Sequence, residues 1–283
     1  MSRLDRGLEA ALRHDRVLIL AALAAMVAIA WVYLWHLASA MDGAASGVSM
    51  PMATGMAMGM PQATPVAADA MQGSPGFALF LAPAFALTFA MWAAMMAAMM
   101  LPSAAPAILA YGGLVRSHGA RGATLPSTWV FALGYLLVWA GFSAAASLLQ
   151  MVLEQRALLT PSLATASTRL GAATLIAAGV WQLTPLKQAC LTRCRSPLTF
   201  FVTRWRAGVG GALRMGLEHG VYCVGCCWAL MLLLFVAGVM NLAWVAAIAV
   251  FVFVEKVAPA GRVVTRAAAV ALLGYGSYLL AVS

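Results

Sequence analysis

The residues best suited to chemistry in this sequence are five cysteines, which fall into two closely spaced groups. They are Cys190, Cys194, Cys223, Cys226 and Cys227. On a helix that turns about 100° per residue, the three later thiols and the imidazole of His219 share one stripe about 100° wide. Thiolates and imidazole are ligands that soft metal ions prefer. We therefore expect a metal site on this stripe, with the two earlier cysteines folding back to complete it.

Two other interpretations of the cysteines stay open. Cysteine is a small apolar side chain, so the cluster could simply fill a tight interface between helices. The thiols could also exchange electrons, because cysteines in the reducing cytoplasm serve as ligands or redox groups more often than as structural disulfides. The spacing is not that of a standard zinc finger, so a tetrahedral zinc site is not indicated.

A second candidate is a run of methionines within a long apolar segment. They are Met91, Met95, Met96, Met99 and Met100. At helical spacing they occupy one half of the circumference, and alanines fill the other half. Small residues let helices approach closely in membranes, so we expect the alanines to pack and the methionines to face a pathway. Methionine is also adaptable packing material, and this alternative stays open.

Residues 41–76 are also rich in methionine, mostly in the pattern Met-x-Met-x3-Met-x-Met-x-Met. That pattern contains Met50, Met52, Met56, Met58 and Met60. Gly, Ala, Ser and Pro dominate the rest, so the segment has no apolar face to bury and is expected to be disordered. A thioether is a soft ligand that selects copper(I) over harder ions. We expect these methionines to collect copper(I), although a neutral linker would have a similar composition.

The composition of the chain predicts that these candidates lie in a membrane protein. The sequence is 64% hydrophobic and only 9% charged, whereas soluble domains are about 25% charged. A span needs roughly 20 apolar residues to cross about 30 Å of hydrocarbon. Seven segments qualify or nearly qualify: 17–39, 77–101, 127–151, 166–184, 216–238, 242–257 and 263–282. The predicted fold is an all-α, polytopic transmembrane helical bundle of about seven spans.

The basic residues predict the orientation of these spans. Of the 17 Lys and Arg residues, only Arg156 and Arg169 lie outside the head and the alternate loops that follow the second, fourth and sixth spans. Lys and Arg concentrate on the cytoplasmic side of membrane proteins. We therefore predict an N-terminus inside, a C-terminus outside, residues 41–76 outside and residues 185–207 inside. This distribution explains the net charge of +9 without nucleic acid.

Three parts of the chain follow from this topology. Residues 1–40 form a cytoplasmic head and the first span, residues 41–76 the disordered methionine-rich outer loop, and residues 77–283 a six-span bundle that carries the Cys and Met motifs. The apolar run of the first span is longer than that of a usual signal peptide, which favours a retained helix.

The sequence gives no indication of an enzyme. It contains no Walker A loop, no His-Glu-x-x-His motif and no arguable Ser-His-Asp arrangement. An ionisable residue at membrane depth is a functional candidate. Glu255 and Lys256, however, are neighbours near a span end, and we expect them to pair with each other at the cytoplasmic boundary. Asn241 is expected to bond to the helix ends around it.

Three blocks of the sequence resemble a known family. The first is Met91-Trp92 through Met99-Met100-Leu101-Pro102-Ser103, with Pro106 and Tyr111. The second is Trp181-Gln182-Leu183-Thr184-Pro185-Leu186-Lys187, with Cys190, Cys194 and Arg195-Ser196-Pro197. The third is Gly220, Cys223, Gly225-Cys226-Cys227-Trp228, Gly238-Val239-Met240-Asn241-Leu242 and Glu255-Lys256 through Pro259. Over about residues 80–260 the chain resembles the bacterial predicted metal-binding integral membrane proteins, a domain of unknown function.

This resemblance implies a multi-pass, metal-binding protein of the bacterial inner membrane. The copper assignment comes instead from ligand chemistry, because the methionine-rich loop is not part of the resemblance. We expect a protein that binds copper(I), or another soft metal ion, and transports or delivers it. The alternatives are a thiol-disulfide or metalloenzyme assembly factor and a structural subunit of a larger metalloenzyme complex. The expected partners are the lipid bilayer, the metal ion, and a membrane protein or a second copy of the chain.

Overall fold

The protein is a bundle of helices. The computed structural model describes residues 3–47, 83–117, 124–160 and 162–283, and these contain no β-strand, only an isolated bridge between Leu159 and Thr165. The all-α prediction is therefore confirmed for this part of the chain. Met50 to Met60 and the rest of residues 48–82 lie outside the described residues.

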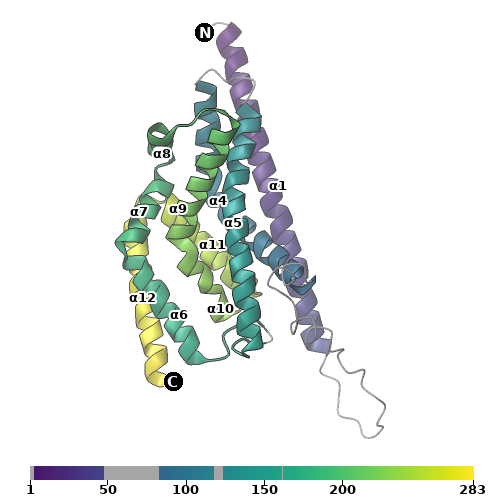
Figure 1. Cartoon of the computed structure of the whole chain (residues 1–283), viewed down its shortest axis with the longest axis vertical. Coiled ribbons are helices and arrows are strands. Elements are labelled where there is room, and N and C mark those ends of the chain that lie inside the picture. Colours follow the sequence, from purple (N-terminus) through teal and green to yellow (C-terminus); the bar gives the residue numbers. More distant parts are fainter. Residues whose placement is uncertain (1–2, 48–82, 118–123, 161) are drawn as a thin grey trace.

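Ten helices make up the described part of the chain. They are α1 (Arg3–Gly47), α4 (Pro83–Ser117), α5 (Thr124–Gln155), α6 (Thr168–Leu183), α7 (Pro185–Arg195), α8 (Pro197–Arg204), α9 (Gly208–Leu232), α10 (Leu234–Ala237), α11 (Leu242–Val257) and α12 (Gly261–Val282). Figure 1 shows α1, α4, α5 and α9 running along the long axis, with α6 and α12 paired on the opposite side from α1. The first helix begins at one end of the molecule and the last ends toward the other (Figure 1).

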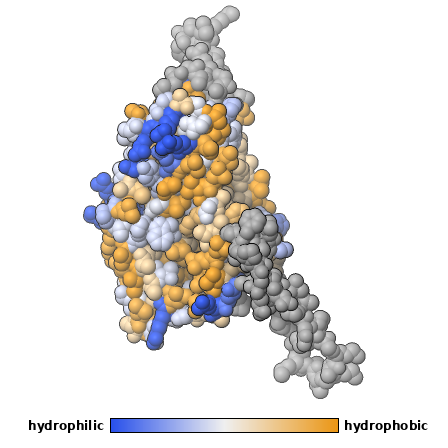
Figure 2. All heavy atoms as spheres, in the orientation of Figure 1, coloured by the Kyte–Doolittle hydropathy of each residue, from blue (hydrophilic) through white to orange (hydrophobic). Residues whose placement is uncertain are grey.

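Within the described residues, five helical segments are long and apolar enough to cross a membrane: Arg16–Ala40, Pro83–Arg116, Pro126–Gln155, Gly208–Ala237 and Gly261–Val282. The two other predicted spans form α6 and α11, which have 16 residues each. A helix of that length is about 24 Å long, short of the roughly 30 Å of hydrocarbon in a bilayer. Figure 2 shows hydrophobic residues over the middle of the molecule and hydrophilic residues gathered toward its two ends.

The predicted loop 185–207 contains two helices instead. The Thr184 hydroxyl accepts a hydrogen bond from the Lys187 amide and caps the start of α7, where Pro185 occupies the first turn. Proline suits this position because the first amides of a helix have no partner within the helix. Pro197 likewise occupies the first turn of α8, although the Ser196 side chain before it makes no capping hydrogen bond. These two Thr/Ser-Pro starts were the sequence signal for both helices, and α7 brings two of the cysteines back to the bundle.

One continuous helix and one turn determine where the candidate residues lie. Helix α4 continues past the predicted end of the second span at residue 101 and runs through both Pro102 and Pro106. The chain reverses between α10 and α11 at Gly238, whose φ of 95° favours glycine. The Asn241 side chain caps α11 by accepting from the Trp244 amide at 3.1 Å, which confirms its predicted role.

Helices α5 and α9 cross in close contact because both carry glycine at the crossing. A methyl group added at Gly134 would come within 2.5 Å of the Leu213 carbonyl oxygen, and one added at Gly216 would overlap the Phe131 carbonyl. Close approach through small residues is a common way for membrane helices to associate. This crossing sets the cysteine stripe of α9 against α5.

Candidate metal centre

The cysteine stripe of α9 faces the interior of the bundle. Cys223, Cys226 and Cys227 are at most 2% exposed. The Cys226 and Cys227 thiols donate to the Cys223 carbonyl at 3.1 and 2.8 Å, which satisfies them within their own helix. These side chains therefore lie on one buried face, as the predicted stripe requires, whereas their role as metal ligands stays a prediction.

Helix α7 brings the two earlier cysteines to the same place. A hydrogen bond to Cys223 is the main cause that raises the pKa of the Cys194 thiol well above its ordinary value, followed by a hydrogen bond to Cys226 and by burial. The Cys190 sulfur packs on Gly225 of α9, where an added methyl group would come within 2.9 Å of it. Burial raises the pKa of Cys190 as well. The expected folding back of this pair toward α9 is therefore observed.

Gly225 allows close packing of α7 on α9 rather than a local unwinding of α9. Local unwinding at Gly220 and Gly225 would suit a site inside a span, but α9 is a continuous helix from Gly208 to Leu232. Gly225 instead lets α7 approach closely, and Gly220 does the same for Tyr135 and Val138 of α5. The two glycines are needed because side chains there would push the neighbouring helices away.

Helices α4 and α5 complete the surroundings of the thiols. The Met100 sulfur lies 4.0 Å from the Cys227 sulfur, and the Tyr135 hydroxyl lies 3.1 Å from the Cys223 sulfur. The Tyr135 hydroxyl also donates to the Met100 carbonyl at 3.3 Å, and Ser103 donates to the same carbonyl at 2.9 Å. Met100 is thus held in place beside the cysteines. We call Cys194, Cys223, Cys226, Cys227 and Met100 the sulfur cluster.

A lysine lies beside the sulfur cluster, which the sequence did not predict. The Lys256 ammonium donates to the Cys223 sulfur at 3.0 Å and to the Ser103 hydroxyl at 3.1 Å, and it lies 4.0 Å from the Met100 sulfur. The expected pairing of Lys256 with Glu255 is wrong. Adjacent residues on a helix point about 100° apart, so these two side chains leave α11 toward different neighbours.

Glu255 pairs with Lys187 of α7 instead. Their side chains are completely buried and lie 2.7 Å apart. The Thr265 hydroxyl of α12 donates to the same carboxylate oxygen at 2.6 Å, and Lys187 also donates to Gln182 of α6. This buried network joins α6, α7, α11 and α12. Nothing in the local sequence around either residue identifies the other as its partner.

His219 lies one helical turn from Cys223, in an aromatic environment. Its ring centroid is about 6 Å from those of Phe131, Tyr135 and Phe200. The side chain is 3% exposed, and its Nδ1 atom has no hydrogen-bond partner among the described residues. His219 is thus buried on the same face as the thiols, whereas its role as a metal ligand stays a prediction.

All five methionines of α4 are buried, between 0 and 6% exposed. Trp92, in the same turn as Met91, packs against Phe235 at 5.3 Å between ring centroids and donates to Gln150 at 2.7 Å. Met95, Met96 and Met99 continue from this layer to Met100 at the sulfur cluster. Met91, Met95, Met96, Met99 and Met100 thus form one buried row, and their burial agrees with packing and with a pathway alike.

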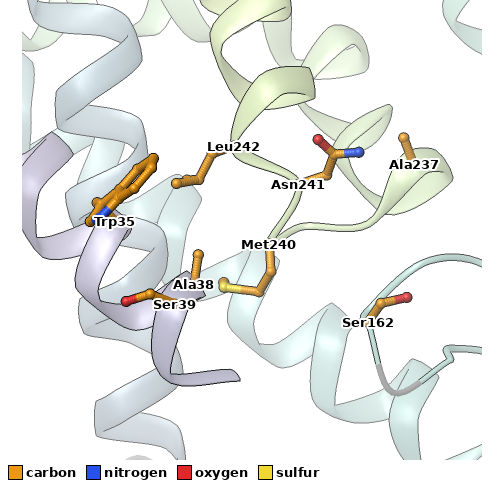
Figure 3. A pocket seen from close by; sticks show the side chains of 8 residues that line it. All are labelled: Trp35, Ala38, Ser39, Ser162, Ala237, Met240, Asn241 and Leu242. Atoms are coloured by element: carbon orange, nitrogen blue, oxygen red, sulfur yellow. The ribbon is translucent and has the colours of Figure 1, made fainter. Parts of the chain in front are cut away.

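A cavity of about 460 Å³ opens beyond the far end of this row, where α1, the α5–α6 connection and the turn before α11 meet (Figure 3). Its lining residues are Trp35, Ala38, Ser39, Ser162, Ala237, Met240, Asn241 and Leu242. The Met240 side chain extends toward Ala38 and Ser39 of α1 (Figure 3). A further thioether therefore lies at the end of the bundle opposite to α8.

The ligand types of the site suit a soft ion, since it combines several thiols with a thioether. Among the residues that the structure describes, no three His, Cys, Asp or Glu side chains are grouped as a ready metal site.

Residues 89–279 match a family model described as "PpoB2: Copper chaperone". No curated protein and no solved structure matches the chain significantly.

Proposed function

Because the chain belongs to the PpoB2 copper chaperone family, we propose that it is a membrane protein that binds copper(I) at the sulfur cluster and delivers it to another protein. The observation that carries this proposal is the convergence of thiols from two separate segments. Cys194 of α7 hydrogen-bonds Cys223 and Cys226 of α9, and Met100 of α4 lies 4.0 Å from Cys227. If the cysteines served only as small apolar side chains that pack between helices, a buried lysine beside them would not be required.

The ligands favour copper(I) over the common divalent ions. Thiolate and thioether are soft ligands, whereas Mg²⁺, Ca²⁺ and Mn²⁺ prefer oxygen. No carboxylate hydrogen bond or ion pair joins the sulfur cluster in the described residues, because Glu255 is bonded to Lys187 and Thr265. A soft ion such as copper(I) is therefore a cargo that these side chains fit.

The proposed route runs from the methionines to the thiols. The protein spans the bacterial inner membrane with its N-terminus in the cytoplasm, and the methionines of the outer loop, Met50 to Met60, collect the ion. Met240 and the buried methionines of α4 then lead to Met100, beside the sulfur cluster. Thioethers bind copper(I) more weakly than thiolates, so affinity rises along the route and gives it a direction. The protein performs no chemical conversion and is not an enzyme.

A thiol-disulfide function is the second candidate, favoured by one observation. All five cysteines are free thiols, and Cys194 contacts Cys223 across two helices. In that function a disulfide of a partner protein would oxidise Cys194 and Cys223 to a disulfide and would itself be reduced to two thiols, with no metal bound. Metal analysis separates the two functions, because only the copper chaperone retains stoichiometric copper under reducing conditions.

The test is metal analysis of the full-length protein purified in detergent, after loading with copper(I) under anaerobic, reducing conditions. We expect about one copper ion per chain, since the sulfur cluster is one connected group of ligands. The variant Cys194→Ser/Cys223→Ser should lose the ion and keep its helicity. Ala229→Ser is the matched control, because it also adds a buried hydroxyl to α9 but lies outside the cluster. The proposal would be overturned if the wild-type protein bound no copper after loading, or if the double variant still bound the ion.

A further inference from the structure

Lys256 is a buried cation that has sulfur, not carboxylate, as its neighbour. Its side chain is 7% exposed and donates to the Cys223 sulfur at 3.0 Å. The adjacent carboxylate of Glu255 is directed to Lys187, with which it forms a fully buried ion pair. The ammonium therefore lies against the atoms that the proposed function assigns to copper.

We propose that the Lys256 ammonium is a built-in competitor of the copper ion, which occupies the sulfur cluster between deliveries and keeps the bound ion exchangeable. This inference rests on the proposed function, because it describes how the same site takes up and releases its cargo. The ammonium contacts Cys223 and lies 4.0 Å from Met100, so it touches sulfur on both α9 and α4.

The distances explain the competition. A metal–thiolate bond is about 2.3 Å long, and the ammonium nitrogen is only 3.0 Å from the Cys223 sulfur. An ion that enters between Cys223 and Met100 would come into contact with the ammonium. Two like charges at such a distance repel each other strongly in a low-dielectric interior. The ammonium must therefore move away when the ion binds, and its return favours release.

The position of Lys256 allows this movement. It is the penultimate residue of α11, which ends at Val257 before a short turn to α12. The long side chain can rotate without a change in the helix. When the ammonium leaves the sulfur atoms, it still has an oxygen partner in the Ser103 hydroxyl, to which it donates at 3.1 Å. Lys187, by contrast, is held by a carboxylate and a side-chain amide. Of the two buried lysines, only Lys256 can therefore give up its sulfur partners to a metal ion.

The test compares copper(I) affinity and release in full-length Lys256→Gln, Lys256→Leu and Lys256→Arg. Affinity is measured by competition with a colorimetric copper(I) chelator, and release by the rate at which excess chelator removes the ion. Gln and Leu remove the charge and add no soft ligand, so both should bind copper at least about tenfold more tightly and release it correspondingly more slowly. Arg keeps the charge and should stay near the wild-type values.

Each other outcome overturns the inference. Weaker binding in both neutral variants would show that the ammonium stabilises the bound ion, and unchanged binding would show that the ion does not approach it. The two neutral variants, Lys256→Gln and Lys256→Leu, differ in shape. If one of them fails to fold, the other still allows the measurement. If wild-type protein binds copper and the neutral variants match it, only this inference fails. If wild-type protein binds none, the proposed function fails with it.

Discussion

The two buried lysines of this protein have opposite surroundings. Lys187 lies 2.7 Å from the Glu255 carboxylate, and both side chains have no exposed surface. Lys256 is the residue next to Glu255 in the sequence. Its ammonium nitrogen lies 3.0 Å from the Cys223 sulfur and 4.0 Å from the Met100 sulfur. Lys187 extends from α7 and Lys256 from α11; the first meets a permanent opposite charge, whereas the second meets candidate metal ligands.

This difference distinguishes a part of the interior that stabilises the fold from the part to which we assign the proposed copper site. A carboxylate that loses its lysine stays charged and buried, which is costly. A thiol that loses its lysine can remain as a neutral group of low polarity. We therefore expect substitutions in the Lys187–Glu255 network to change stability most, and substitutions in the sulfur cluster to change copper binding most.

The largest effect is expected for Lys187→Met. It leaves the Glu255 carboxylate buried without its partner, which should destabilise the protein by about 3–5 kcal/mol. Thermal unfolding of the purified protein, followed by helicity, measures this effect. The double variant Lys187→Met/Glu255→Leu removes both charges and should recover most of the loss. A double variant as unstable as the single one would mean that the pair does not act as a unit.

The next largest effect is expected for Gly225→Ala, which tests how closely α7 must approach. The added methyl group would come within 2.9 Å of the Cys190 sulfur, and overpacking of this kind costs about 1–3 kcal/mol. We expect copper affinity to fall as well, because α7 also carries Cys194. Gly141→Ala on α5 is the matched control, since nothing lies within 4 Å of the added methyl group there. Equal affinity in both variants would contradict a shared site between α7 and α9.

A smaller loss of stability is expected for Lys256→Gln. The hydrogen bonds of a charged group contribute about 1.5–3 kcal/mol each, but the substitution also removes the cost of burying the ammonium, and no carboxylate is left unpaired, because Glu255 keeps Lys187. Unfolding measured beside Lys187→Met gives the direct comparison of the two lysines. A loss as large as that of Lys187→Met would remove the distinction between a structural and an exchangeable lysine.

Met100→Leu should change stability least among the buried variants. Exchange of Met for Leu conserves volume and usually costs less than about 1.5 kcal/mol, while it removes the only thioether near Cys227 for which a contact is described. Copper affinity should therefore fall while the unfolding temperature stays close to that of wild type. Met215→Leu provides the control, because Met215 is equally buried on α9 but lies outside the cluster. Loss of affinity in both variants would assign the effect to packing.

No change in stability is expected when Met50, Met52, Met56, Met58 and Met60 are all replaced by leucine, since the segment has no apolar face to bury. Copper uptake into cells or vesicles should nevertheless slow down, because thioethers that could collect the ion are removed. The purified bundle should still bind one ion. Uptake at the wild-type rate would show that the segment is only a linker.

Much of the architecture could be predicted from residue types alone. Long apolar runs with few charges require helices in lipid, because every backbone group must be bonded within its own segment. The period of the helix then placed Cys223, Cys226 and Cys227 on one face, and their burial agrees with that prediction. The number of spans was harder, because 166–184 and 242–257 are apolar enough but form helices of only 16 residues.

The partners of the charged residues could not be predicted in this way. Glu255 and Lys256 are neighbours in the sequence, and a local interpretation pairs them. Their contacts depend instead on which helices lie on either side of α11, with Lys187 of α7 on one side and Cys223 of α9 on the other. Helical periodicity gives the direction of each side chain relative to its own helix, but not the identity of the helix that it faces.

By itself, then, the sequence determined the helical class, the inward stripe of thiols and the soft character of the ligands, because these depend on composition and on the period of one helix. Only the tertiary structure decided that α7 returns Cys194 to Cys223, that Lys187 neutralises Glu255, and that Lys256 is left beside sulfur. These contacts join residues far apart in the chain. They arise from close packing at Gly134, Gly216 and Gly225, whose effect depends on the helix that lies opposite each glycine.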